Sequence, residues 1–385
     1  MNLNDYFNPV SLEKPDFHMV PGNLTFSRSL RIHTPDTPVK NIEKYDLAII
    51  GVPEDQNAVI KGSSSAPDHV RSKLYQLSSL NRKVSVIDLG NIKITGNIND
   101  TYFALRDLTS ELRTKDVVPV FIGGSQDLTH GIVKAFEIPG TSFTLGSIDA
   151  RIDFGYKEKQ ISSANYLDII LSGKKPSDFN FFNLGHQVYF SHTKIIDQLE
   201  KRGYECVRLG TARTDLSGIE PYLRDTGFLS IDMCSVRHSD APGVTIPSPN
   251  GFYGHELCQI ARYAGTATKI EGIGFFELSP ENDINDHTSH LTAQAIWYFM
   301  EGFSLKMNEK ADRPGNKKYI VNLGELKHKL IFYKSTRSDR WWMELPVADK
   351  ASGNNIIISC TYKDYLQACN QDIPDRWLKA YTRFH

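Results

Sequence analysis

The stretch Ser142–Asp153, SFTLGSIDARID, places a short apolar run directly before a group of charged side chains. The run Ser142–Ile148 has the length and composition of a buried β-strand. Asp149, Arg151 and Asp153 follow it at alternate positions. In an open parallel sheet, ligands bind beyond the carboxyl ends of the strands. These three residues are therefore candidates for a functional site.

Seven further runs of this kind occur between residues 46 and 276, and helix-length amphipathic segments separate most of them. Helices are predicted over Ala66–Leu77, where apolar residues recur at helical spacing, and over Thr288–Phe303. This alternation is typical of an α/β fold in which helices cover both faces of an eight-stranded parallel sheet. The predicted strands are Asp46–Val52, Val84–Leu89, Val117–Ile122, Ser142–Ile148, Gln187–Phe190, Glu205–Leu209, Phe228–Ile231 and Lys269–Phe276.

Polar side chains follow four of these strands, on what must be the same rim of the sheet. Four of them are carboxylates, and like charges at close range raise one another's pKa values. Such a rim needs a divalent cation or a buried arginine for compensation, unless its residues are simply solvated loop starts. The candidate residues are Gln126, Asp149, Arg151, Asp153, Asp232, Cys234 and Glu277.

The composition of the 385 residues excludes several classes of protein. Hydrophobic residues make up 40% and charged residues 23%, as in ordinary globular proteins. With 44 Lys and Arg against 45 Asp and Glu, nothing indicates a nucleic-acid partner. Five cysteines without a CxxC pair argue against a disulfide framework or a zinc ribbon. Since no signal peptide and no run of 18 apolar residues is visible, we expect a cytoplasmic protein without a membrane span.

The two ends of the chain differ from the middle. Residues 1–40 are rich in Pro, Asn and Thr and are predicted to form an N-terminal arm on the surface, before an α/β domain over 41–306. The charged segment 307–317 contains Pro314-Gly315 and is typical of a linker. Residues 318–385 are predicted to form a small α+β appendage. Its expected elements are strands at Lys329–Ser335, Trp341–Leu345 and Asn355–Thr361 and a helix at Asp375–Phe384.

Aromatic residues are dense in the appendage, around Trp341-Trp342 and the pair Phe332-Tyr333. Such a patch usually packs a small domain against a larger one. Tryptophan is also enriched at the centres of protein interfaces, so a partner-binding surface is the alternative.

From about Asp46 to Phe303 the sequence resembles the ureohydrolase family of arginase, agmatinase and formimidoylglutamase, and formimidoylglutamase most closely. FIGGSQDLTHG is similar to the family's GGDHS segment, and SIDARID to its DAHxD segment. FLSIDMCSVRHSDAPGVTIPSPNG is similar to the SxDxD segment, and GFFELSPENDINDHTSHLTAQ to the segment with a substrate-facing glutamate, here Glu277. DLAIIGVPED and KGSSSAPDHVRSKLY are similar to the first strand, turn and helix. The resemblance implies a three-layer arginase-like fold and hydrolysis of C–N bonds in linear amidines.

The resemblance also implies two manganese ions held by two histidines and four aspartates, and here the sequence departs from the family. Its two histidine positions hold Gln126 and Arg151, and one aspartate position holds Cys234. Asp149, Asp153 and Asp232 remain. A guanidinium has no lone pair to offer a metal and stays protonated. We expect Arg151 to replace the second cation and to neutralise Asp149 and Asp232.

Our main expectation is that the chain holds no cofactor. If it does hold a metal, the remaining oxygen ligands would suit at most one ion of Mg²⁺, Mn²⁺ or Ca²⁺. The alternative to this oxygen-ligated ion is a zinc site at Asp232 and Cys234, with His130, His186 or His238 as the third ligand. No spacing in the sequence supports the zinc site. The segment GYKEKQISSANYL after Asp153 lacks the histidine that shuttles protons in the family.

These features favour a non-catalytic member of the family, a pseudoenzyme that binds a ligand, through Glu277 and Arg151, or binds a protein partner. We expect a protein partner or a homo-oligomer. One alternative is a single-metal or altered hydrolase of a linear amidine such as N-formimidoyl-glutamate. Another is a structural subunit that assembles through its C-terminal appendage.

Overall fold

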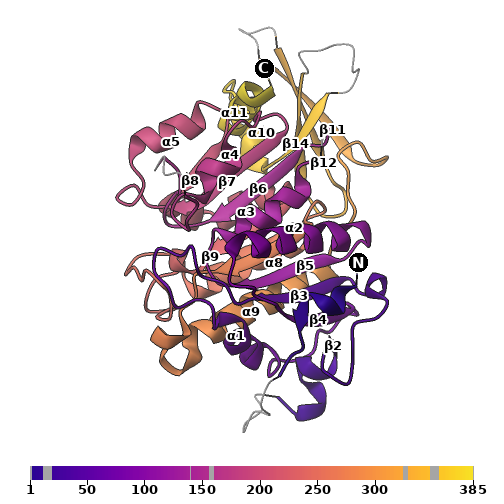
Figure 1. Ribbon diagram of the computed structural model, residues 1–385. Coiled ribbons are helices and arrows are strands. Elements are labelled where there is room, and N and C mark those ends of the chain that lie inside the picture. Colours follow the sequence, from indigo (N-terminus) through magenta and orange to yellow (C-terminus); the bar gives the residue numbers. More distant parts are fainter. Residues whose placement is uncertain are drawn as a thin grey trace.

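A computed structural model describes residues 2–11, 20–138, 140–155, 160–323, 328–346 and 355–384. Its centre is a ten-stranded sheet in the order β1-β4-β3-β5-β10-β9-β6-β7-β8, with β2 also paired to β4 (Figure 1). Neighbouring strands from β4 to β8 along this order are parallel. The eight strands that carry the sheet are β3 (Leu47–Val52), β4 (Val86–Ile92), β5 (Val118–Gly123), β6 (Phe143–Ile148), β7 (Phe179–His186), β8 (Glu205–Arg208), β9 (Phe228–Asp232) and β10 (Gly272–Phe276).

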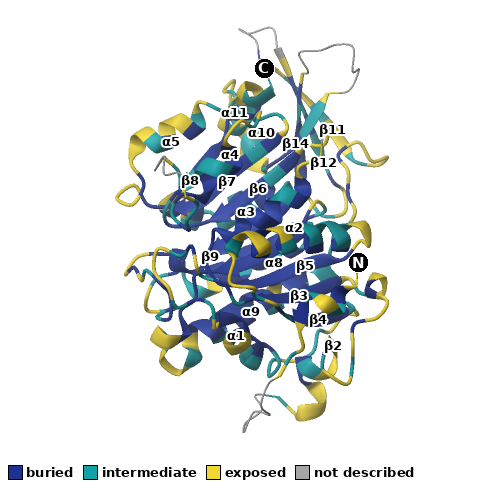
Figure 2. Cartoon of the chain, viewed as in Figure 1, coloured by how far each residue is buried: buried dark blue, intermediate teal, exposed yellow. Residues whose placement is uncertain are grey.

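Helices cover both faces of the sheet, so the domain has three layers. Successive strand residues point to opposite faces: Leu47 and Ile49 pack in one core, and Ala48 and Ile50 in the other. One core includes α1 (Ala66–Leu74), α6 (Leu209–Thr214), α7 (Glu220–Arg224), α8 (Gly254–Gly265) and α9 (His287–Ser304). The other includes α2 (Ile98–Thr114), α3 (Leu128–Val133), α4 (Tyr166–Leu171) and α5 (Thr193–Glu200). The predicted α/β fold is confirmed, and Figure 2 shows its central strands buried.

One predicted strand is wrong. Residues Gln187–Phe190 form a turn, and the strand is the preceding β7. The asparagines in FNFFNLGH obscured that strand in the sequence. Because a turn carries Val188, Tyr189 and Phe190, these three apolar side chains are exposed.

The N-terminal arm does not simply lie on the surface. Its short strands β1 (Phe7–Asn8) and β2 (Arg31–Ile32) pair with β4, antiparallel and parallel respectively. Phe7 and Phe26 are each only 1% exposed. The arm therefore extends the sheet at the β4 side and contributes to both cores.

The C-terminal segment forms a second sheet, antiparallel in the order β11-β12-β13-β14. Its strands are β11 (Lys317–Leu323), β12 (His328–Lys334), β13 (Trp341–Leu345) and β14 (Ile356–Cys360), followed by α10 (Tyr362–Cys369) and α11 (Asp375–Phe384). Sequence analysis did not predict β11 or α10. The division of the chain at 40, 306 and 317 stays a prediction.

The appendage packs against the main domain through the predicted aromatic patch. Trp341 and Trp342 are buried, and the Arg224 guanidinium lies 4.9 Å from the ring of Trp342. Arg224 also donates hydrogen bonds to the carbonyl oxygens of Trp341 and Cys360. The docking interpretation of this patch therefore agrees with the structure. Within the described ranges, no helix is long and apolar enough to cross a membrane.

Candidate functional site

Four adjacent strands bring the predicted rim residues together. The strands β5, β10, β9 and β6 are neighbours in the sheet. Their carboxyl ends carry the candidates: Gln126 lies in the turn after β5, Asp149 follows β6, Asp232 ends β9 and Glu277 follows β10. The convergence predicted from the sequence is therefore correct.

The turn after β5 is fixed by a close backbone approach. A Cβ atom at Gly124 would lie 1.7 Å from the carbonyl oxygen of Glu54, so only glycine fits there. The carbonyl of Gly124 accepts a hydrogen bond from the Glu277 amide at 2.9 Å. In return, the Gln126 amide donates to Glu277 Oε1 at 2.8 Å. These contacts lock the β5 and β10 loops together.

Three buried carboxylates surround Arg151. Asp149, Asp153 and Asp232 are at most 2% exposed. Burial raises the pKa of Asp149 well above its usual value, and Asp153 and Asp232 raise it further. Burial also raises the pKa of Asp232, and that of Asp153 to about 6. Burial opposes the charge of Arg151, but Asp153 and Asp149 outweigh it and raise the pKa of this guanidinium.

The guanidinium of Arg151 faces the carboxylates, as expected, but its partner differs from the prediction. Arg151 Nε donates to Asp153 Oδ1 at 2.8 Å, whereas only the backbone amide of Arg151 donates to Asp149. Asp232 Oδ1 accepts from the Cys234 amide instead. Asp149 Oδ1 is instead occupied by the backbone amide of Arg151, at 2.8 Å. The Arg151 side chain is 26% exposed, while the Asp153 side chain is fully buried.

Glu277 has neutral partners. Besides the Gln126 amide, its carboxyl group accepts a hydrogen bond from Thr245 Oγ1 at 2.7 Å. Burial raises the pKa of Glu277 to about 8, and the charge of Asp232 adds to this shift. Among the described residues, no hydrogen bond joins Glu277 to Arg151. Glu277 is therefore a largely protonated acid near neutral pH.

The Arginase family model matches residues 45–301, about two thirds of the chain. The chain belongs to the arginase family. It is 26% identical to a formimidoylglutamase of Staphylococcus carnosus, over 67% of this chain and 87% of that protein. The formimidoylglutamase of Bacillus subtilis is 24% identical, over 67% and 87% respectively.

Solved structures of arginase-family proteins share the fold of this chain. The crystal structure of Bacillus subtilis formimidoylglutamase matches with a TM-score of 0.65 at 22% identity, covering 77% of this chain and 97% of that one. Trypanosoma cruzi formiminoglutamase, a structure with Mn²⁺, matches with a TM-score of 0.63 at 20% identity, covering 70% and 97%. These likenesses confirm the predicted arginase-like fold.

A pair of manganese ions does not fit the residues of this arginase-family chain. Arg151 offers only hydrogen-bond donors, and its guanidinium already engages Asp153. Among the candidate residues, three buried oxygens have no hydrogen-bond partner within the described part of the chain, namely Gln126 Oε1, Asp149 Oδ2 and Asp153 Oδ2. They leave acceptor capacity for a proton, a water or one cation.

The three histidines of the zinc alternative lie in different surroundings. His130 contacts the Tyr102 ring edge-on at 5.4 Å, and burial lowers its pKa to about 4. Burial lowers the pKa of His186 to the same value, and His238 is exposed. Cys234 is a buried thiol 3.4 Å from Thr245 Oγ1, and burial keeps its pKa well above the usual value. In the segment after Asp153, residues 156–159 lie outside the described ones.

Sequence analysis missed two groups that support the site. Thr245 contacts both Cys234 and Glu277. In the sequence, the only sign of this role is that Thr245 is a polar residue in an otherwise apolar and proline-rich segment. Ser230 lies two positions before Asp232 on β9, and its hydroxyl accepts from Gln126 Nε2 at 3.2 Å. Strand periodicity would have placed Ser230 on the same face as Asp232.

Proposed function

We propose that this arginase-family protein is a non-catalytic member that binds a ligand or a protein partner at the rim. The observation that carries the proposal is the ion pair between Arg151 and Asp153 within a buried group of carboxylates. The guanidinium supplies a positive charge where the family resemblance places a metal ion. A pseudoenzyme of this kind would keep the fold and the anchoring loops while losing the hydrolytic centre.

The loss of the metal pair has a large energetic consequence for hydrolysis. Free water has a pKa of ~15.7, and coordination to a metal ion lowers it towards ~7. Each pKa unit corresponds to ~1.4 kcal/mol. Without that activation, most of a hydrolase's rate advantage is lost.

The ligand would meet Arg151 and Glu277. Among the rim candidates, Arg151 is the most exposed, and Glu277 presents a carboxyl group with a raised pKa after β10, on the other side of β9. Gln126 Oε1 adds a buried acceptor without a partner. A small molecule with both a hydrogen-bond donor and an anionic group would suit this arrangement.

The second candidate is a hydrolase of C–N bonds in a linear amidine such as N-formimidoyl-glutamate. Two observations favour it: several relatives are named formimidoylglutamases, and three buried oxygens of the rim candidates have no hydrogen-bond partner among the described residues. One Mg²⁺, Mn²⁺ or Ca²⁺ ion at Gln126, Asp149, Asp153 and Asp232 would belong to this candidate.

An assay of ammonia release from N-formimidoyl-L-glutamate separates the two candidates. The full chain is incubated with excess Mn²⁺, and the same assay is run on Arg151→Ala and on a formimidoylglutamase as positive control. The pseudoenzyme proposal predicts release at the uncatalysed rate for both forms of this chain. Release that depends on the enzyme concentration and on added metal would refute it in favour of the hydrolase.

A further inference from the structure

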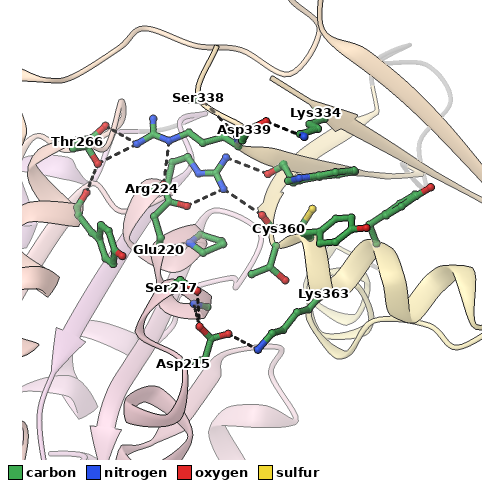
Figure 3. A pocket seen from close by; sticks show the side chains of 18 of the residues that line it. Asp215, Ser217, Glu220, Arg224, Thr266, Lys334, Ser338, Asp339, Cys360 and Lys363 are labelled. Carbon is green, nitrogen blue, oxygen red and sulfur yellow. Dashed lines mark hydrogen bonds and ion pairs between the residues drawn. The ribbon is translucent and has the colours of Figure 1, made fainter. Parts of the chain in front are cut away.

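A cavity of about 900 Å³ lies between the main domain and the appendage (Figure 3). Its main-domain wall comes from α7 and from the end of α8, which lead into the amino ends of β9 and β10. The cavity is therefore at the opposite edge of the sheet from the rim that carries Arg151. Its volume lies within the ~300–1,000 Å³ that is typical of small-molecule sites.

One wall of the cavity is aromatic. Trp341 stacks on Tyr319 and on Tyr365, with ring centroids 5.3 Å and 4.9 Å away. Tyr362 lies 5.4 Å from Trp341 and is 52% exposed, so part of its ring is free to contact a ligand. Three different elements, β11, β13 and α10, hold these rings in place.

Away from the aromatic rings, the cavity lining carries more positive than negative charge. Glu220 is shared by two guanidinium groups, with its oxygens 3.0 Å from Arg224 Nη2 and 3.2 Å from Arg340 Nε. Arg340 Nη1 is buried and has no hydrogen-bond partner among the described residues. Counted over both walls, the described residues that line the cavity include five basic and three acidic side chains.

A lysine also lines the cavity next to Tyr362 in the sequence. Lys363 directly follows Tyr362 at the start of α10, and its side chain is 75% exposed. Its partner is Asp215, at 2.7 Å on the facing wall (Figure 3). Surface ion pairs of this kind are weak, so a stronger anion can displace the carboxylate.

We propose that this cavity binds a nucleoside phosphate. The flat base would stack on the aromatic wall at Tyr362, where base–aromatic contacts are favourable for any base. The phosphate would be held by Lys363 and by the excess positive charge of the wall that carries Arg224 and Arg340. The positive lining disfavours a cation, and an apolar ligand would leave the charged wall without a partner.

Calorimetric titration of the full chain with AMP tests this proposal, with adenosine and ribose 5-phosphate as partial ligands. We expect AMP to bind with an affinity that falls as salt is added, and each partial ligand to bind at least tenfold more weakly. No heat of binding with millimolar AMP overturns the proposal. Equal binding of either partial ligand also overturns it, because the missing half would then contribute nothing.

Two substitutions locate the site. Tyr362→Ala and Lys363→Ala each remove an exposed side chain, and each should weaken AMP binding roughly fivefold or more. Tyr298→Ala and Lys194→Ala remove comparable exposed side chains elsewhere and should leave the affinity unchanged. Thermal melts confirm that all four variants are folded. If Tyr362→Ala and Lys363→Ala bind AMP like the native chain, the cavity is not the site.

Discussion

Arg151 supplies a fixed positive charge to three buried carboxylates that would otherwise have to bind protons or a metal ion. Its pairing with Asp153 is partly accessible to solvent, since the Arg151 side chain is 26% exposed. The energy of this pair is therefore smaller than that of a fully buried ion pair. Removal of the arginine still leaves carboxylates in a site where burial disfavours their charge.

Arg151→Ala should lower the free energy of unfolding by about 1–3 kcal/mol at neutral pH. Urea denaturation measures the change. The loss should shrink at acidic pH, because the carboxyl groups are then protonated and no longer need the guanidinium. Arg106→Ala, which breaks the exposed pair with Asp107, is the control and should change stability far less than Arg151→Ala. Equal losses at both pH values would contradict this account of Arg151.

The raised pKa values also predict how the stability of the metal-free chain depends on pH. The pKa of Glu277 rises from 4.5 to about 8, and that of Asp153 from 3.8 to about 6. Between the unfolded and folded values, the folded chain keeps protons that the unfolded chain releases. The contribution of these two groups to stability therefore falls as the pH rises from about 4 to 8, with a slope of at most ~1.4 kcal/mol per pH unit for each proton; the buried His130 and His186, whose pKa values are lowered to about 4, oppose it below about pH 6.5.

Glu277→Gln should flatten this dependence between about pH 6 and pH 8, where Glu277 is the main titrating group of the two. Denaturation midpoints measured across this range provide the test. Glu301→Gln, at a surface pair with Arg262, should leave the slope unchanged. If Glu277→Gln and the native chain show the same slope over this range, Glu277 does not carry a raised pKa and the account is wrong.

At the level of elements, the site depends on the turn that joins β5 to α3. Gly124→Ala should destabilise the fold by about 3 kcal/mol, since the new methyl group would collide with the Glu54 carbonyl. Gly22→Ala adds the same methyl group in open space and should change stability by no more than about 0.5 kcal/mol. Thermal unfolding of the two variants tests this difference.

The strand ends explain how much of the site the sequence revealed. A polar residue after an apolar run predicts a place on the rim, and Gln126, Asp149, Asp232 and Glu277 all occupy it. The hydrogen-bond partners were not predictable, because they depend on side-chain directions within one loop. The choice of Asp153 by Arg151 is the clearest case.

Some strands of the sheet could not be predicted because their pairing joins distant parts of the chain. The contact of β1 and β2 with β4 joins segments far apart in the chain, and each strand has only two residues. Such short strands carry no periodic signal. The strand β7 was missed for a different reason, since its asparagines are unusual in a buried strand.

For the whole molecule, the appendage and the main domain are joined by a buried cation. Arg376 on α11 donates hydrogen bonds to the carbonyls of Ser359 and Pro221, and its guanidinium lies 3.4 Å from Glu205 on β8. Its side chain is 10% exposed and that of Glu205 is 5% exposed. The two parts should therefore unfold together.

Arg376→Ala should lower stability by about 3–5 kcal/mol, because it leaves Glu205 buried without its cation. Lys379→Ala removes a half-exposed partner of Glu200 on the same helix and should cost at most about 1 kcal/mol. Denaturation followed by tryptophan fluorescence compares the two variants with the native chain. If Arg376→Ala is as stable as Lys379→Ala, the buried pair does not fasten the appendage.

The central claim is that an arginine now stands where the arginase family resemblance places the second metal ion. Manganese content tests it most directly: the full chain is loaded with excess Mn²⁺, freed of unbound metal by gel filtration, and analysed by elemental mass spectrometry. We predict no more than one ion per native chain, and a gain in bound manganese for the triple variant Gln126→His, Arg151→His and Cys234→Asp. Two manganese ions in each native chain would contradict the claim.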